Sequence, residues 1–361
     1  MDNSNIAIIG VPKEIKTLEK RVGLTPDSTK NLVENGFRVF IESGAGEGSY
    51  FSNEQYKEAG AEIVANVDDV WNKVDLVVKV KEPQSSEFKY LRNDLVLFTY
   101  LHLAAYPQVM KACVDSGVTA IAYEAVEVDG ELPLLKPMSV VAGRIAAQEV
   151  AHYLMAPHGG RGQMLGGVQG VGNASIAIVG GGNVGQAAAE VTLGMGAEVT
   201  LIDIDESVLA KCKKKFEYFG DQLKLVSSRD YLSDNISKFD AIIGAVLVPG
   251  NKAVTVVTKE MISKMVNGSV VADVAIDQGG CIETSRETSH SEPVYSVDGV
   301  LHYCVGNIPG SVPISSTLAL NNATRSFVLE LARDGVEAFG EKYPDAINVS
   351  NHEVLLDYLK N

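Results

Sequence analysis

The sequence predicts an α/β protein with two parallel-sheet domains, on three observations. Short apolar runs with strand character alternate with helical stretches through about the first 130 residues, which is the pattern of a parallel sheet. A second alternating region starts near residue 176 and contains a glycine turn between a strand and a helix. The 361 residues are enough for two domains with a large core.

The expected elements follow from apolar periodicity and from helix start and stop signals. The predicted strands cover 6–10, 37–43, 62–64, 74–80, 95–101, 119–123, 176–179, 198–202, 241–248 and 269–276. The predicted helices cover 26–36, 53–60, 106–116, 137–155, 184–195, 316–334 and 353–359. Small residues at helical spacing in 137–155 predict close packing against another helix, and 158–170 is expected to be a glycine-rich loop.

The segment 176–205 carries the motif from which a cofactor can be predicted. Gly180, Gly182 and Gly185 have the G-x-G-x-x-G spacing between an apolar strand and a helix, where free N–H groups at the helix start would face phosphates. Asp203 ends the next strand 18 residues after Gly185. A carboxylate there accepts hydrogen bonds from both ribose hydroxyls and repels a 2′-phosphate. The motif predicts NAD rather than NADP, and an ordinary tight turn is the weaker alternative.

Composition excludes several other classes of protein. A net charge of −15 argues against binding to nucleic acid or to an anionic membrane surface. The four cysteines, Cys113, Cys212, Cys281 and Cys304, have no metal-ligand spacing, so no metal site is expected and buried thiols in a reducing compartment are predicted. There is no signal-peptide pattern and no apolar run approaching roughly 18–20 residues. We therefore expect a cytoplasmic soluble protein.

Chemistry is expected beyond the carboxyl ends of the strands. Lys81 and His102 follow two apolar runs of the first domain, Arg21 lies in the loop after its first strand, and Asp277 follows the run 269–276. A cationic clamp for a carboxylate, a histidine that exchanges protons near neutral pH and a nicotinamide are what an NAD-linked dehydrogenase of a small anionic acid needs. Position in the sequence alone leaves alternatives open. Arg21 and Lys81 could be solvated loop charges, His102 could be a hydrogen-bonded core histidine, and Asp277 could cap the following turn.

Longer motifs carry a family resemblance. They include GVPKEIKTLEKRVGLTP (10–26), LFTYLHLA (97–104), LPLLKPMS (132–139), HGGRGQMLGGVQGV (158–171), DVAIDQGGC (273–281) and HYCVGNIPGSVP (302–313). With these motifs the chain resembles the bacterial L-alanine dehydrogenases of the alanine dehydrogenase and transhydrogenase alpha-subunit family. The resemblance implies two Rossmann-like doubly wound domains with an interdomain cleft. Residues 1–134 plus 311–361 would form a discontinuous substrate domain, and 135–310 the NAD-binding domain.

The resemblance also implies an activity and a set of site residues. The activity is NAD-dependent, reversible oxidative deamination of L-alanine to pyruvate, ammonium and NADH by a homo-oligomer, usually a hexamer. Arg21 and Lys81 would bind the substrate, His102 would be the general acid and base, and Asp277 the second catalytic group. The residues expected at NAD contacts are Ser139, Gly180, Gly182, Asn183, Val184, Gly185, Asp203, Ser227, Val246, Leu247, Val274, Asn307 and Ile308.

Three positions depart from the family pattern. Val140 replaces a glutamate, and Gly306 and Ile308 replace an alanine and a methionine, with consequences for pocket shape and substrate preference. The alternatives are therefore a dehydrogenase of another small 2-amino acid, or a reductase of glyoxylate. A transhydrogenase NAD-binding subunit would not need the LFTYLHLA histidine or the AIDQGG motif. A non-catalytic NAD-sensing module would be expected to lose at least one of the four proposed catalytic and substrate-binding residues.

Overall fold

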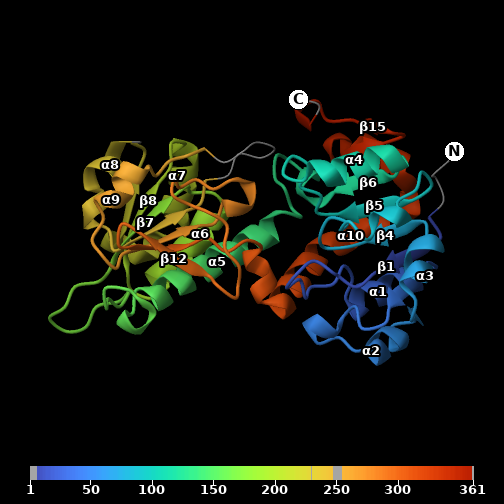
Figure 1. Ribbon diagram of the computed structural model, residues 1–361, viewed down its shortest axis with the longest axis horizontal. Helices are drawn as coiled ribbons and strands as arrows, with labels where there is room; N and C mark the ends of the chain where they lie inside the picture. The colour runs from blue at the N-terminus through green and yellow to red at the C-terminus, as the bar shows by residue number, and fades with distance from the viewer. Residues whose placement is uncertain (1–5, 229, 247–253, 360–361) are drawn as a thin grey trace. The chain divides into compact units, whose positions relative to one another are not determined.

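The computed structural model describes residues 6–228, 230–246 and 254–359, and the chain divides into two compact units (Figure 1). The first unit comprises Met1–Met138 and Gly310–Asn361, and the second comprises Ser139–Pro309. Each contains one sheet in which parallel pairing dominates, with helices beside it. The predicted α/β class is therefore confirmed.

The sheet of the first unit has the strand order β15-β14-β6-β5-β4-β1-β2-β3. Its parallel strands are β1 (Ile8–Val11), β2 (Arg38–Glu42), β3 (Glu62–Val64), β4 (Leu76–Val78), β5 (Val96–Thr99) and β6 (Thr119–Ala122). The antiparallel edge strands are β14 (Ile347–Ser350) and β15 (Glu353–Val354). The helices are α1 (Pro26–Glu34), α2 (Asn53–Glu58), α3 (Val67–Asn72), α4 (Pro107–Ser116) and α10 (Pro313–Lys342).

The predicted helix over 353–359 is wrong. Val354 pairs with Val349 in the antiparallel β14–β15 ladder, and a single 3-10 turn, Asp357–Leu359, follows. A few apolar residues at a chain end fit a helix or a strand equally well, and the neighbouring strand decides between them.

The sheet of the second unit has the strand order β12-β13-β11-β10-β7-β8-β9. Its strands are β7 (Ser175–Val179), β8 (Glu198–Ile202), β9 (Leu223–Val226), β10 (Ala241–Gly244), β11 (Val270–Asp273), β12 (Val294–Val297) and β13 (Val300–Tyr303). Only the edge strand β12 is antiparallel to its neighbour, and β9, β12 and β13 were not predicted from the sequence. The helices are α5 (Lys136–Tyr153), α6 (Asn183–Gly194), α7 (Glu206–Lys215), α8 (Asp230–Asn235) and α9 (Lys259–Ser263).

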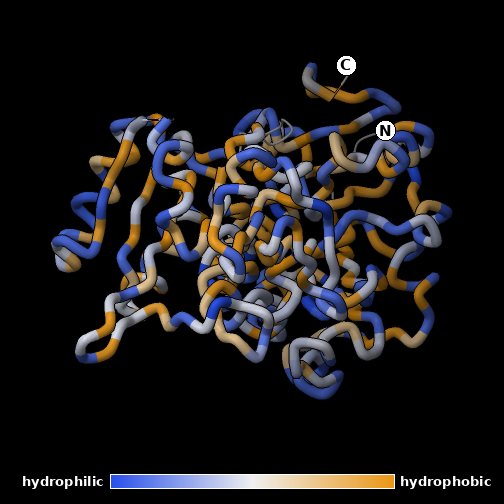
Figure 2. The backbone as a smooth tube through the Cα atoms, turned by 60° about the vertical axis from the view of Figure 1, so that its left-hand side comes forward, coloured by the Kyte–Doolittle hydropathy of each residue, from blue (hydrophilic) through white to orange (hydrophobic). Residues whose placement is uncertain are grey.

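Packing in each unit depends on buried strands and on close backbone approaches. The central strands β4, β5, β6, β10 and β11 are buried along their whole length, whereas the edge strands are partly exposed. Figure 2 shows the alternation of hydrophobic and hydrophilic stretches along the chain. On α5, a Cβ at Gly143 would lie 2.2 Å from the carbonyl oxygen of Val184 at the start of α6. The close helix packing that the small residues predict is therefore confirmed. In the described part of the chain, no helix combines the length and the apolar character needed to cross a bilayer.

Candidate active site

Three of the predicted site residues follow neighbouring strands of the first sheet. Arg21 lies in the loop after β1, Lys81 comes shortly after β4, and His102 shortly after β5. Because β5, β4 and β1 are adjacent and parallel, their carboxyl ends meet at one edge of the sheet. The fold therefore brings the three loops together on the first unit.

Arg21 is a buried, oriented cation. Its residue is 2% exposed, and its guanidinium binds the Glu19 carboxylate through Nε to Oε1 at 2.8 Å and Nη2 to Oε2 at 2.5 Å. Burial lowers the pKa of Arg21, but the charge and the hydrogen bond of Glu19, with smaller contributions from Tyr100 and Glu14, together raise the pKa overall. A bidentate pair of this kind sets the direction of the guanidinium plane. The alternative of a solvated loop charge is wrong for Arg21.

Lys81 is also buried, with 5% of the residue exposed, so it too is no solvated loop charge. The carboxylate of Glu14 accepts the backbone N–H groups of Val80 at 2.6 Å and of Lys81 at 3.3 Å. Glu14 also lies 3.3 Å from the ammonium of Lys79, which donates to Glu87 at 2.8 Å. Burial raises the pKa of Glu14, although Lys79 opposes the shift. A buried ion network thus ties the β1 loop to the segment that carries Lys81.

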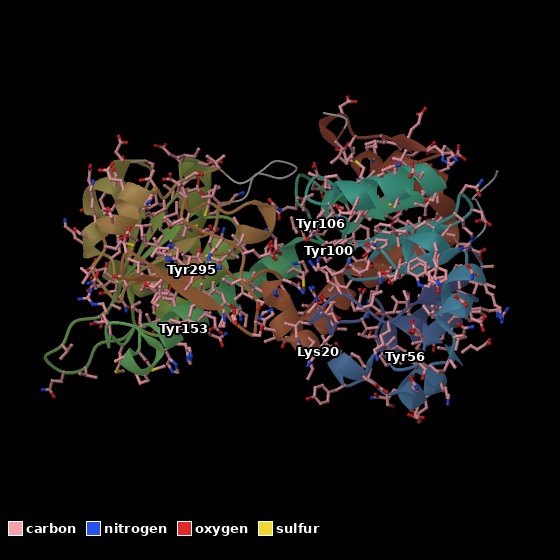
Figure 3. All side chains as sticks on the ribbon, in the orientation of Figure 1. Lys20, Tyr56, Tyr100, Tyr106, Tyr153 and Tyr295 are labelled. Atoms are coloured by element: carbon pink, nitrogen blue, oxygen red, sulfur yellow. The ribbon has the colours of Figure 1, made fainter. Side chains whose placement is uncertain are left out.

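His102 occupies a constrained, partly exposed position. Its φ is +47°, in the left-handed region that side-chain-bearing residues rarely adopt. Its backbone N–H donates to Oε1 of Glu124 at 2.6 Å, and Nδ1 lies 3.7 Å from the same oxygen. The imidazole is stacked parallel to the Tyr100 ring at 5.8 Å between centroids, and its side chain is 23% exposed. Tyr100 and Tyr106, which flank His102 in sequence, are labelled in Figure 3. A buried core histidine does not fit this exposure.

The glycine turn of the second unit has the geometry that a dinucleotide requires. Gly180 has φ +104°, and a Cβ there would lie 2.6 Å from the Ala245 carbonyl oxygen. A Cβ at Gly185 would lie 1.8 Å from the Gly180 oxygen, so only glycine allows α6 to start here. Nothing lies within 4 Å of the Cβ position of Gly182, the N-cap of α6, which has no capping side chain. The turn therefore leaves an open approach to the first N–H groups of α6.

Asp203 is joined to this turn. Its Oδ2 accepts the N–H of Gly181 at 2.6 Å, and its Oδ1 accepts the N–H of Asp205 at 2.9 Å. The carboxylate is thus held at the end of β8 beside the glycine turn, where the motif predicts the ribose. The residues present fit an adenine dinucleotide.

The remaining predicted cofactor residues gather at one edge of the second sheet. Most of them follow the carboxyl ends of the parallel strands: Ser227 after β9, Val246 after β10, Val274 after β11, and Asn307 and Ile308 after β13. Asn183 and Val184 begin α6, and Ser139 lies on α5 one turn before Gly143. Leu247 lies outside the described residues.

Asp277 and Asp273 play different parts in the turn after β11. The buried Asp273 carboxylate accepts the N–H groups of Ala275 at 3.1 Å, Cys281 at 3.2 Å and Ile282 at 3.0 Å, so it caps the turn. Asp277 is exposed and accepts the N–H of Asn307 at 3.1 Å. Asn307, like His102, has a left-handed backbone, with φ +56°, and its N–H is the group that Asp277 accepts. Asp273 therefore caps this turn, and Asp277 lies exposed at its surface beside Asn307.

Sequence reasoning missed the carboxylates that support the site. Glu14, Glu19 and Glu124 each contact a predicted site residue or its backbone. Glu124 follows β6, the strand next to β5, so the rule that found His102 also indicates this residue. Glu14 and Glu19 lie in a charged loop, where nothing in the sequence distinguishes a buried acid from a solvated one.

The two sheets and the glycine turn define a two-unit α/β protein of the dinucleotide-binding type. Family profiles described as "Alanine dehydrogenase/PNT, N-terminal domain" and "Alanine dehydrogenase/PNT, C-terminal domain" match residues 10–142 and 146–355. The chain belongs to the alanine dehydrogenase/PNT family, as its motifs predict.

Individual relatives support this assignment. The chain is 51% identical over 330 residues to "Alanine dehydrogenase" of Bacillus subtilis (strain 168), covering 91% of this chain and 86% of that one. It is 48% identical to "Alanine dehydrogenase 2" of Staphylococcus aureus (strain USA300), covering 96% and 93%. A solved structure titled "L-alanine dehydrogenase" superposes with a TM-score of 0.92 at 44% identity, covering 98% of both chains. A transhydrogenase from Sinorhizobium meliloti, at 24% identity and a TM-score of 0.82 over 97% of this chain and 99% of its own, shares the fold.

Proposed function

We propose that this chain is an NAD-dependent alanine dehydrogenase that converts L-alanine reversibly into pyruvate, ammonium and NADH. The observation that carries the proposal is the grouping of Arg21, Lys81 and His102 at neighbouring strand ends in a member of this family. A carboxylate-binding arginine, a second cation and a partly exposed histidine are the groups that a 2-amino acid requires.

Substrate binding is assigned to the two buried cations. Arg21 holds the alanine carboxylate, and Glu19 keeps its guanidinium in a fixed plane so that little rotamer entropy is lost on binding. Lys81 pairs with the substrate oxygen, and Glu14 fixes its backbone. Both cations are buried, so their attraction for an anion is stronger than in water.

The chemical steps are assigned to His102 and Asp277. The glycine turn and Asp203 would hold NAD, which would supply the hydride acceptor for Cα of an alanine whose amine is neutral. The iminopyruvate that remains adds water, and His102 takes the proton that this water loses. Asp277 orients the water. His102 returns the proton to the nitrogen, and when the C–N bond of the carbinolamine breaks, the hydroxyl proton passes to His102, which leaves pyruvate and ammonia. Proton transfers of this type contribute about 10²–10⁴-fold each.

The same proposal includes the remaining cofactor contacts and the assembly. The first unit carries the substrate groups, and the second carries the NAD contacts, including Leu247.

The protein acts in the cytoplasm as a homo-oligomer, a hexamer, with no nucleic acid or membrane partner. Exposed apolar side chains on the second unit, Met164, Val168 and Val171, favour association between copies. Light scattering at several concentrations tests the stoichiometry, and a monomer would contradict it.

A substrate panel tests the activity. NADH oxidation with pyruvate plus ammonium is compared with glyoxylate and with longer 2-oxo acids plus ammonium. We expect pyruvate to have the highest kcat/KM. A preference for glyoxylate or for a longer oxo acid would mean that the natural substrate is a 2-amino acid other than alanine. Gly306 and Ile308 would then be the first residues to mutate, because they depart from the family pattern. Inactivity with every oxo acid would favour a binding module.

A single variant tests the role of His102. His102→Ala should lower kcat about 10²–10⁴-fold, because proton transfer is lost, while NADH binding measured by fluorescence stays the same. His352→Ala, at an exposed histidine of the same unit, is the control. Near-normal turnover of His102→Ala would overturn the assignment.

A further inference from the structure

Gly306 provides space for the carboxylate of Glu287. A Cβ at position 306 would lie 2.2 Å from Oε1 and 3.0 Å from Cδ of Glu287, and 3.2 Å from Oδ1 of Asp277. The backbone of Gly306 is outside the left-handed region, unlike that of Asn307 at φ +56°. A left-handed backbone therefore does not explain the glycine at this position. The absence of a side chain instead leaves room for the carboxylates of Glu287 and Asp277.

The backbone holds Glu287 in this place. Thr288 donates its N–H to the Cys304 carbonyl at 2.9 Å and accepts the N–H of Gly306 at 3.1 Å. These two bonds form a parallel bridge between Thr288 and Val305, which keeps the residue before Thr288 in register with position 306. Asp277 is held from the other side by the N–H of Asn307. The two carboxylates are neighbours because of backbone pairing.

The charge of this pair is not balanced within the described part of the chain. There, neither Glu287 nor Asp277 forms an ion pair. The nearest cation in sequence, Arg286, is engaged elsewhere, since its guanidinium lies 4.1 Å from the centre of the Tyr295 ring, a residue labelled in Figure 3. Both carboxylates are exposed. Glu287 therefore adds a second negative charge beside the proposed catalytic Asp277.

We propose that Glu287 is a specificity-determining residue that favours the ammonium ion in the reductive direction. This inference rests on the proposed function, in which Asp277 orients the group that adds to the reacting carbon. In the reductive direction that group comes from ammonium, which gives a proton to His102 before its nitrogen adds. A second negative charge beside Asp277 raises the local concentration of a small cation and has no such effect on a neutral amine. Gly306 contributes to this specificity, because without a Cβ it lets the Glu287 carboxylate lie beside Asp277.

Two single variants and their combination test the proposal. Glu287→Gln removes the charge and keeps the shape. Gly306→Ala keeps the charge but moves it, since the new methyl displaces the flexible end of Glu287 rather than any backbone atom. Each should raise KM for ammonium about two- to five-fold, the size expected for an exposed charge interaction. The rise should shrink as ionic strength increases, while kcat and KM for pyruvate change less.

The double variant distinguishes this mechanism from a general effect of either change. In the Glu287→Gln background, Gly306→Ala should add little to KM for ammonium, because no charge remains to be displaced. Glu292→Gln, at an exposed acid five residues further along the chain, controls for net charge and should behave like the wild type. A loss confined to kcat in Gly306→Ala would indicate displacement of Asp277 and would overturn the proposal.

The outcomes separate this inference from the proposed function. A wild-type enzyme active with pyruvate and ammonium, combined with unchanged KM for ammonium in both single variants, overturns the inference alone. Equal effects of Glu287→Gln and Glu292→Gln also overturn it, because only overall charge would then matter. A wild-type protein inactive with every oxo acid overturns the function, and the inference with it.

Discussion

Oε1 of Glu124 accepts the backbone N–H of His102 at 2.6 Å and lies 3.7 Å from Nδ1 of the same histidine. The carboxylate therefore contacts both the unusual backbone and the ring of the proposed acid and base. A left-handed backbone at a histidine costs free energy and persists only where its surroundings hold it. Glu124, together with the stacked Tyr100, supplies this constraint.

Removing Glu124 should impair catalysis more than binding. A hydrogen bond to a charged group contributes ~1.5–3 kcal/mol, so Glu124→Ala should lower kcat about 10- to 100-fold. Glu124→Gln keeps an acceptor and should retain more activity. Steady-state kinetics as a function of pH measure both effects, with the exposed Glu127→Gln as the control. Wild-type kcat in Glu124→Ala would show that the backbone needs no such support.

Asp203 should govern the choice between the two dinucleotides. In Asp203→Asn the side-chain oxygen still accepts the N–H of Gly181, while the negative charge that repels a 2′-phosphate is gone. The ratio of kcat/KM with NADP to kcat/KM with NAD should rise about tenfold, equivalent to ~1.4 kcal/mol. Asp205→Asn, which alters the N-cap of α7, is the matched control. If discrimination is unchanged, another group sets the preference.

Replacing Lys79 should lower the free energy of unfolding. It is 1% exposed between Glu14 and Glu87, so Lys79→Met leaves two carboxylates buried without their cation. Breaking a buried ion pair in this way costs ~3–5 kcal/mol of the free energy of unfolding. Urea unfolding measures the change, and Lys73→Met, in an exposed pair with Asp69, should cost less than ~1 kcal/mol. Adding Glu14→Gln and Glu87→Gln should restore part of the loss.

His302 should make the folded protein less stable in mild acid. The residue is 0% exposed, with Nδ1 3.0 Å from the Val300 carbonyl and Nε2 2.7 Å from the Thr284 hydroxyl. Burial lowers the pKa of His302 from its usual 6.5, although Asp273 and Asp298 oppose the shift. Below pH 6.5 the unfolded chain therefore takes up the proton more readily than the folded one. The free energy of unfolding should fall as pH drops from 6.5 toward the folded pKa.

The variant His302→Gln isolates this contribution. Urea unfolding at several pH values between about 5 and 8 should show a smaller acid loss in the variant than in the wild type. His352→Gln, at an exposed histidine, should keep the wild-type slope. Parallel pH profiles for wild type and His302→Gln would contradict the assignment.

Much of the fold and of the candidate site could be predicted from local patterns. The sequence by itself determined the parallel α/β class, because short buried strands alternating with helices have few other arrangements. It also determined the dinucleotide turn, since Gly180 and Gly185 stand where a Cβ would meet backbone oxygen. Arg21, Lys81 and His102 were selected as candidates because the ends of parallel strands share one edge, and their catalytic roles stay predictions.

Only the tertiary structure decided which charges are buried and what they contact. Glu14, Glu19 and Glu287 resemble solvated acids in the sequence, yet the first two lie against buried cations and the third lies beside Asp277. The C-terminal segment became β15 through pairing with β14, a partner that local propensity does not reveal. Burial, electrostatic pairing and strand register depend on residues distant in sequence, so they are settled only when the chain folds.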